Sequence, residues 1–202
     1  MDSLYSLPSE YEELRQSVRA LAQKEIAPHA AAVDEDHCYP QEAADALLKA
    51  GLSAAHVPTE FGGEGADALA VVLIIEEVAR VCASSSLIPA VNKLGSLPLI
   101  LSGSKAQKEK WLPLLATGEA IGTFALAEGN GRPSAKSLKT KMSGAGLNGR
   151  KLPVPDGRAA DFAIIVGASD SGDGASMYLV ELDQAGVSRE AVRTLDFSRG
   201  HA

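Results

Sequence analysis

The stretch that decides the fold runs from Phe124 to Asp161, where several short sequences follow one another in order. They read FALAEGN over 124–130, LKTK over 138–141, LNGRK over 147–151 and AADFAIIVGAS over 159–169. The chain before this stretch is patterned for helices, and the chain after it consists of short apolar runs bounded by turn residues. Helices that precede strands, rather than alternating with them, predict an α+β protein with a helical domain over 1–118 and a strand domain over 119–202.

The first half of the chain carries helical periodicity. Apolar residues recur at helical spacing from Leu14 to Ile26, Ser9 and the neighbouring acids suit a capped first turn, and Pro28 lies just past the expected end. A second helix is expected to open at Pro40 and to stop at Gly51. Further helices are expected over 67–82, 86–101 and 105–115, with a glycine-rich loop over 58–65.

Short strands are expected after Gly118, over 121–126, 146–152, 161–167 and 176–182. The sequence GDG at 172–174 predicts a hairpin turn between the last two. Gly144, Gly146 and Gly149 match the spacing of a dinucleotide-binding motif, but that motif must follow a strand and open a helix. Here the glycines lead into a strand, so we interpret them as part of a hairpin.

Composition excludes several classes of protein. The formal charge of −7 and the lack of a basic patch with interleaved aromatic residues argue against a nucleic-acid partner. No apolar run approaches the roughly 20 residues of a membrane span, and the first residues lack a signal-peptide pattern. The two cysteines, Cys38 and Cys82, have neither a disulfide nor a metal-binding spacing. A cytoplasmic setting is therefore expected.

The ordered segments resemble the acyl-CoA dehydrogenase family, which reads FALTEPxxGSD, TKA, LNGxKxWITN and AD in this region. The resemblance extends through RQSVRALAQKEIAPHAAAVDED at 15–36, KAGLSAAHVPTEFGGEG at 49–65, EEVARVCASSS at 76–86 and GSKAQKEKWLPLLATGEAIGTFALAE at 103–128. It covers the chain from about Tyr11 to Ala202 in the family's order.

The resemblance implies a helical N-terminal domain followed by a partial antiparallel β-barrel. The last barrel strands and the family's C-terminal four-helix domain are expected to be missing. In the family that domain carries the carboxylate base, much of the FAD adenine pocket and most oligomer contacts. No catalytic residue is therefore assigned in this chain.

The implied activity is the FAD-dependent α,β-dehydrogenation of a fatty or sterol-derived acyl-CoA thioester. In that reaction a base removes the α-proton and the flavin accepts the β-hydrogen as hydride. An electron-transfer acceptor and a homo- or hetero-oligomeric state are implied as well. Two alternatives stay open: a non-catalytic partner subunit of an acyl-CoA dehydrogenase complex, and a flavin-dependent oxidase or monooxygenase on the same fold.

The resemblance also implies site residues. The backbone of Phe124, Leu126 and Ala127 would face one side of the isoalloxazine ring, and Lys151 to Pro155 would flank its other side. The cofactor-binding residues expected on this basis are Phe124, Leu126, Ala127, Pro153, Val154 and Pro155. Arg132 and Ser134 are expected near the substrate, although a solvated loop charge is an equally good interpretation of Arg132.

The chain departs from the family where the flavin would be touched. Ala127 replaces a threonine and Gly129 a proline, and Arg132 to Ser134 stand where the family has GSD. Pro153, Val154 and Pro155 replace Trp-Ile-Thr, which removes a hydroxyl, an aromatic ring and two backbone N–H groups. Ala127, Pro133, Pro153 and Pro155 are the features that favour the partner-subunit alternative.

Other residues receive structural interpretations. Glu128 is expected to be structural rather than catalytic, and Trp111 to belong to the core. A helix-capping role is preferred for Ser84 to Ser86 over a role near an acyl chain. The four histidines, His29, His37, His56 and His201, have no mutual spacing for a metal site or a catalytic triad, so none is assigned a function.

Overall fold

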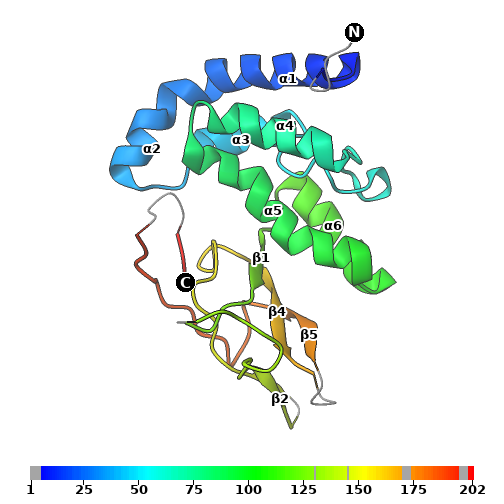
Figure 1. Ribbon diagram of the computed structural model, residues 1–202, viewed down its shortest axis with the longest axis vertical. Coiled ribbons are helices and arrows are strands. Elements are labelled where there is room, and N and C mark those ends of the chain that lie inside the picture. Colours follow the sequence, from blue (N-terminus) through cyan, green and yellow to red (C-terminus); the bar gives the residue numbers. More distant parts are fainter. Residues whose placement is uncertain (1–5, 130, 145, 170–173, 196–199) are drawn as a thin grey trace.

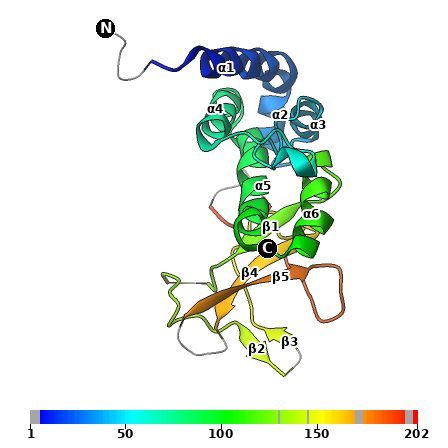
Figure 2. The same ribbon diagram turned by 90° about the vertical axis from the view of Figure 1, so that its right-hand side faces the viewer.

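The computed structural model describes residues 6–129, 131–144, 146–169, 174–195 and 200–202. A layer of helices lies above a small twisted sheet, with α1 farthest from the strands (Figure 1). In the perpendicular view the hairpin formed by β2 and β3 projects away from the helices (Figure 2). The α+β order predicted from the sequence is confirmed.

The first helical run is longer than predicted. Helix α1 (Ser9–Leu21) continues through a π-helical turn (Ala22–Ile26) and a 3-10 turn (Ala27–His29) into α2 (Ala30–Asp36). Pro28 therefore lies inside the run and not past its end. It occupies the first turn of a new helical segment, where its missing N–H is not needed. Ser9 does not cap α1, because the cap position is Pro8.

The four remaining predicted helices are present, with bounds that differ at some ends: α3 (Gln41–Lys49), α4 (Ala68–Ala79), α5 (Ala83–Ser102) and α6 (Lys105–Thr117). The Asp67 carboxylate caps α4 by accepting from the Ala70 N–H at 2.9 Å. The expected loop at 58–65 contains one 3-10 turn, Thr59–Phe61.

Helix α5 begins earlier than predicted, so the capping role proposed for Ser84 to Ser86 is wrong. Cys82 holds the cap position without a side-chain bond, and the three serines are buried in the first turn. The Ser86 hydroxyl donates back to the Ala83 carbonyl at 2.7 Å, as serines in a helix often do.

The sheet consists of β1 (Gly122–Ala125), β2 (Lys141–Ser143), β3 (Gly146–Asn148), β4 (Phe162–Ala168) and β5 (Ala175–Glu181). Strand β4 pairs parallel with β1 and β2 and antiparallel with β5. The sheet is therefore mixed, not wholly antiparallel as expected. The reason is that a long excursion, not a hairpin, joins β1 to β4, which lets both strands run in the same direction.

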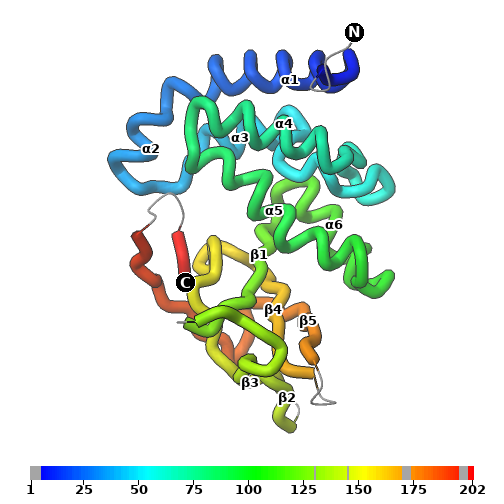
Figure 3. The backbone as a smooth tube through the Cα atoms, viewed as in Figure 1, coloured from blue at the N-terminus to red at the C-terminus, as the bar shows by residue number. Residues whose placement is uncertain are grey.

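Two hairpin predictions have different outcomes. Strands β2 and β3 pair antiparallel with Ser143 opposite Gly146, which confirms the hairpin interpretation of the glycine-rich sequence. Strands β4 and β5 also pair antiparallel, with Ala168 opposite Ala175. The predicted turn at 172–174 lies partly outside the described residues. The smooth trace in Figure 3 shows the sheet region on one side of the helices, with β1 leading down from them.

The strand predicted over 146–152 is shorter in the structure. It ends at Asn148, and Leu152 returns to the sheet only as a single bridge to Glu128. Gly149 passes so close to Thr140 that an added Cβ would lie 2.2 Å from the Thr140 hydroxyl oxygen. Pro153 then cannot donate to a ladder, which prevents the strand from extending.

The helices and the sheet share a core across residue 118. The Trp111 ring packs on the Phe162 ring with centroids 4.5 Å apart, which confirms the core role predicted for Trp111. Gly95 of α5 approaches Gly122 of β1 so closely that an added Cβ would lie 2.6 Å from the Gly122 carbonyl carbon. Helix α6 ends at Gly118, whose φ is +74°. A domain boundary at this residue stays a prediction.

Within the described ranges, no helix combines the length and the apolar character that crossing a membrane requires.

Candidate functional site

Two chain segments meet at the end of β1. The Leu152 N–H donates to the Ala127 carbonyl at 3.0 Å, and the Gly129 N–H donates to the Leu152 carbonyl at 2.9 Å. These bonds form a parallel bridge between Glu128 and Leu152. The structure therefore brings the segment with Leu126 and Ala127 beside the segment that leads to Pro153, as the sequence predicted. Whether these residues hold a cofactor stays a prediction.

Glu128 fastens this junction. Its carboxylate accepts from the Lys139 N–H at 2.7 Å, the Thr140 N–H at 2.9 Å and the Lys151 ammonium at 2.8 Å. The same ammonium donates to the Leu126 carbonyl at 3.0 Å. The Glu128 and Lys151 side chains are only 13% and 6% exposed. We call this set of hydrogen bonds the Glu128 clamp, since it joins three segments that are distant in sequence.

The electrostatics of the clamp keep Glu128 ionised. Burial raises the pKa of the carboxyl, but the hydrogen bonds from Lys151, Thr140 and Lys139 outweigh it and hold the pKa at about 2. A carboxylate with such a low pKa is a poor proton acceptor near neutral pH. This arrangement supports the structural interpretation of Glu128.

The backbone of Leu152 to Pro155 is bonded within the protein. The Val154 N–H donates to the Ala202 carbonyl at 2.8 Å, and the Ala202 N–H donates back to Val154 at 3.1 Å. The buried Thr123 hydroxyl donates to the Pro155 carbonyl at 2.5 Å. Val154 is buried, which agrees with its position between these partners.

The hydrogen bonds of this backbone decide whether it has donors for the flavin that the family resemblance implies. The isoalloxazine ring presents several acceptor atoms and one N–H, and a protein that holds the acceptor atoms by hydrogen bonds must supply donors. The donor set of 152–155 does not fit this requirement. The Leu152 and Val154 N–H groups are already bonded, and the two prolines carry none.

The predicted substrate residues lie on an exposed loop between β1 and β2. Arg132 and Ser134 are both exposed. The Ser134 N–H and hydroxyl both bond to the Ser137 hydroxyl at 3.0 Å, so this part of the loop is held locally. Both interpretations of Arg132 remain open, and a substrate role for either residue stays a prediction.

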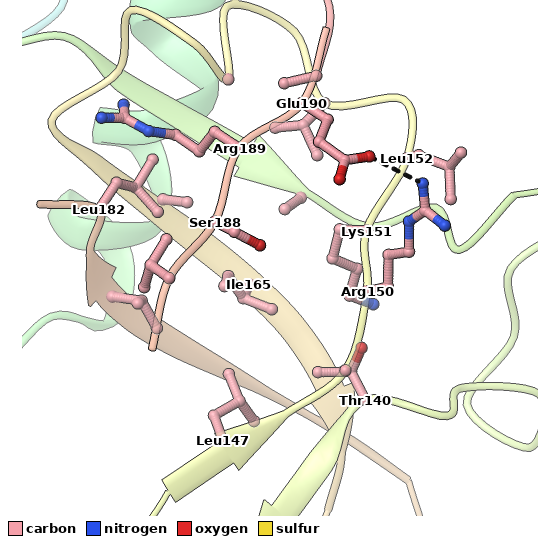
Figure 4. A pocket seen from close by; sticks show the side chains of 18 of the residues that line it. Thr140, Leu147, Arg150, Lys151, Leu152, Ile165, Leu182, Ser188, Arg189 and Glu190 are labelled. Atoms are coloured by element: carbon pink, nitrogen blue, oxygen red, sulfur yellow. Dashed lines mark ion pairs between the residues drawn. The ribbon is translucent and has the colours of Figure 1, made fainter. Parts of the chain in front are cut away.

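A cavity of about 490 Å³ lies against the sheet. Figure 4 shows Ile165 and Ser188 near the middle of the view, with Arg150 and Glu190 facing each other near one side. Their charged atoms are 3.7 Å apart. Arg189 also lines the cavity and donates to the Arg158 and Ala160 carbonyls at 3.0 and 2.9 Å. Sequence reasoning missed these residues, because the lining comes from segments that carry no common motif.

A smaller cavity of about 290 Å³ lies between α3, α5 and the approach to β1. Ser53 and Asn92 line it, and the Asn92 amide donates to the Ser53 carbonyl at 3.1 Å. Nearby, the His56 ring contacts the Ser96 hydroxyl. Burial and the neighbouring Lys93 lower the pKa of His56 to about 4, so this imidazole is neutral near pH 7. Among the residues that the structure describes, no group of His, Cys, Asp and Glu could hold a metal ion.

Known proteins resemble this chain in sequence. The family profile described as acyl-CoA dehydrogenase, N-terminal domain, matches residues 8–119. A probable acyl-CoA dehydrogenase of Mycobacterium tuberculosis is 45% identical over 192 residues, covering 92% of this chain and 49% of that protein. The chain thus spans about half the length of the curated relatives it matches.

Solved structures of dehydrogenases have a similar fold over nearly the whole of this chain. A glutaryl-coenzyme A dehydrogenase in complex with glutaryl-CoA matches with a TM-score of 0.88 and 26% identity, over 100% of this chain and 54% of that one. A glutaryl-CoA dehydrogenase of Mycobacterium smegmatis in complex with FADH2 matches with a TM-score of 0.84 and 26% identity, over 96% of this chain and 51% of that one.

Proposed function

The chain belongs to the acyl-CoA dehydrogenase family, and on that premise we propose that it forms the helical and sheet portion of a protein that oxidises an acyl-CoA thioester between its α and β carbons. The observation that carries the proposal is this chain's 45% identity to a probable acyl-CoA dehydrogenase over 92% of its length. The junction of segments 126–129 and 151–155, fastened by the Glu128 clamp, is the place that we propose for the cofactor. Its relatives are oxidoreductases of this kind, which supports the same reaction class here.

The cofactor that we propose is FAD, because a similar structure is in complex with FADH2. The proposed contacts are the backbone of Phe124, Leu126 and Ala127 on one side and of Pro153 to Pro155 on the other. The donor set on the second side does not fit, so we derive no catalytic step through the flavin.

This chain's own residues supply position rather than proton transfer. Glu128 is ionised and fully bonded, so it holds the junction together and is not proposed as the base. The proposed substrate is a fatty acyl-CoA, with Arg132 and Ser134 on the exposed loop as its contacts. An electron-transferring partner, an oligomeric state and a cytoplasmic location are part of the same proposal.

The second candidate is a non-catalytic subunit that completes a partner's site. The bonded backbone of Leu152 to Pro155 favours it, since a segment without available donors is ill suited to hold a flavin ring. The oxidase or monooxygenase alternative keeps the same fold and differs in the reaction of its flavin with oxygen. Oxygen consumption with an acyl-CoA substrate distinguishes it from a dehydrogenase.

The first test is the visible absorbance spectrum of the purified chain after incubation with FAD and desalting. Retained flavin absorbance supports the dehydrogenase proposal. The test variant, Lys151→Met, removes the clamp's cation. The matched control, Lys136→Met, removes an exposed lysine from the loop. Flavin that is retained by the wild type and Lys136→Met but lost from Lys151→Met supports the site.

A colourless wild-type chain, together with a colourless complex after mixing with an acyl-CoA dehydrogenase paralogue, would contradict the flavin site. A coloured complex formed only after mixing would favour the partner-subunit candidate.

A further inference from the structure

We infer that the segment Leu152–Pro155 donates no hydrogen bond to a bound flavin, and that the missing N–H groups of Pro153 and Pro155 limit the FAD affinity of this chain. The inference rests on the proposed function, since it concerns the site where FAD would bind. It goes further by assigning the role of two named residues in cofactor affinity.

The donors of the segment are fully accounted for. The Leu152 N–H is bonded to Ala127 at 3.0 Å and the Val154 N–H is bonded to Ala202 at 2.8 Å. Pro153 and Pro155 have no N–H. The side chains of leucine, valine and proline carry no donor either. Within this fully described segment, every donor is therefore used inside the protein.

The acceptors hold the segment in the same orientation. The Leu152 carbonyl accepts from Gly129 at 2.9 Å, and the Pro155 carbonyl accepts from Thr123 at 2.5 Å. The Val154 carbonyl accepts from Ala202 at 3.1 Å and from Gly157 at 3.2 Å. Turning an N–H toward a ligand would require the segment to break bonds on both sides. Such a rearrangement leaves buried polar groups unpaired, which is unfavourable.

The consequence concerns how a flavin ring would be held. A ring that packs on Leu152 to Pro155 receives no hydrogen bond from this segment. Hydrogen bonds to its acceptor atoms must come from elsewhere, including the segment that follows β1. A single new donor at residue 155 should therefore strengthen binding, because it adds a bond where none exists.

The test compares FAD dissociation constants, measured by flavin fluorescence, for three variants and the wild type. Pro155→Thr restores an N–H and adds a hydroxyl, whereas Pro155→Ala restores an N–H alone. Pro58→Ala is the control, because Pro58 lies in the 58–65 loop and bonds only through its carbonyl. One added hydrogen bond tightens binding roughly threefold to tenfold. Pro155→Thr is expected to show the largest gain and Pro58→Ala none.

A second measurement does not depend on affinity. Amide hydrogen exchange is followed at Leu152 and Val154 with and without FAD. Both amides are expected to be protected in the free chain, and to gain no more protection from FAD than amides far from the site, such as those of α1. A gain at either amide that exceeds the gain in α1 would overturn the inference, because the segment would then be donating to the ligand.

The outcomes separate this inference from the proposed function. If the wild type and all variants bind FAD equally well, the inference fails and the proposed flavin site stands. If Pro155→Thr binds FAD more tightly than wild type and Pro58→Ala does not, both are supported. If no variant binds FAD, the affinity role of the prolines is overturned. The proposed flavin site then fails with it, even where Leu152 and Val154 remain protected.

Discussion

Two carboxylates, Glu77 in the helical half and the largely buried Glu128 in the sheet half, are stabilised in their ionised form in different ways. Glu77 of α4 is 2% exposed and accepts two hydrogen bonds from the Arg19 guanidinium of α1, at 2.8 and 2.7 Å. Arg80 adds a weaker contact at 3.5 Å. Glu128 relies on a single ammonium and two backbone N–H groups of a loop.

The difference shows what each pair stabilises. The Glu77 pair joins two helices whose positions their own apolar faces already determine, since Val18 and Val78 are both fully buried. The Glu128 clamp holds loop backbone that has no regular structure of its own. We therefore expect the molecule to tolerate damage to the helical pair better than damage to the clamp.

The largest difference is expected from removing the cations. Lys151→Met keeps the side-chain stem but leaves a buried carboxylate without its counter-charge, which lowers the free energy of unfolding by about 3 kcal/mol. Arg19→Met should cost less, because the Arg19 side chain is 44% exposed and Arg80 still faces Glu77. Urea denaturation of both variants measures this. A larger loss for Arg19→Met would reverse the comparison.

The next largest effect is a loss of stability in acid. The pKa of Glu128 is about 2 in the folded protein and 4.5 when unperturbed. Its ionised form therefore stabilises the fold at pH values above 4.5. That contribution is lost as the pH falls from about 4.5 toward 2, by ~2 kcal/mol. Glu77, whose pKa is lowered by its Arg19 hydrogen bonds, acts in the same direction.

Glu128→Gln should flatten the acid limb of the stability profile, because the amide does not titrate. Glu77→Gln serves as the matched variant in the helical half. Thermal denaturation followed across the acid range distinguishes the two. An unchanged acid limb in Glu128→Gln would show that this carboxylate is not the group that titrates.

Double-mutant cycles compare the coupling energies of the two charged pairs, which are smaller than the effects above. Combining Glu128→Gln with Lys151→Met should reveal a coupling energy of about 1 kcal/mol, since the two side chains are in contact and buried. The cycle of Glu77→Gln with Arg19→Met should give less. Additive effects in the first cycle would contradict the role of the Glu128–Lys151 contact.

The smallest effect is expected where the two halves touch at the surface. The Lys110 ammonium lies 2.5 Å from Glu181 of β5 and 4.7 Å from the Trp111 ring centre. Both charged side chains are about half exposed, so Lys110→Ala should cost only ~0.5 kcal/mol. Lys105→Ala, which removes a pair within α6, is the control and should cost less still. Chemical denaturation detects the difference.

The amino-acid sequence alone predicted most of the helical half. The helices at 41–50 and 105–115 were located because helical periodicity and end signals such as Pro40 and Gly51 act within a few residues. The family resemblance was also confirmed by comparison. Pro28 was misjudged, because a proline signals a helix end equally well when it begins the next helical segment.

The sheet half was predicted less completely. Strand β2 was missed, since three residues with alternating exposure resemble a loop. The parallel pairing of β1 with β4 depends on contacts between residues such as Phe124 and Ile164, which no local pattern records. The cavity beside Arg150 and Glu190 was missed for the same reason.

By itself, the sequence determined where helices and turns lie and which family the chain belongs to, because those properties depend on neighbouring residues and their order. Only the tertiary structure decided the bonding of Leu152 to Pro155 and the clamp at Glu128. Their partners, Ala202, Thr123 and Thr140, are distant in the chain. A backbone N–H is available to a ligand or occupied within the protein according to what folding places beside it.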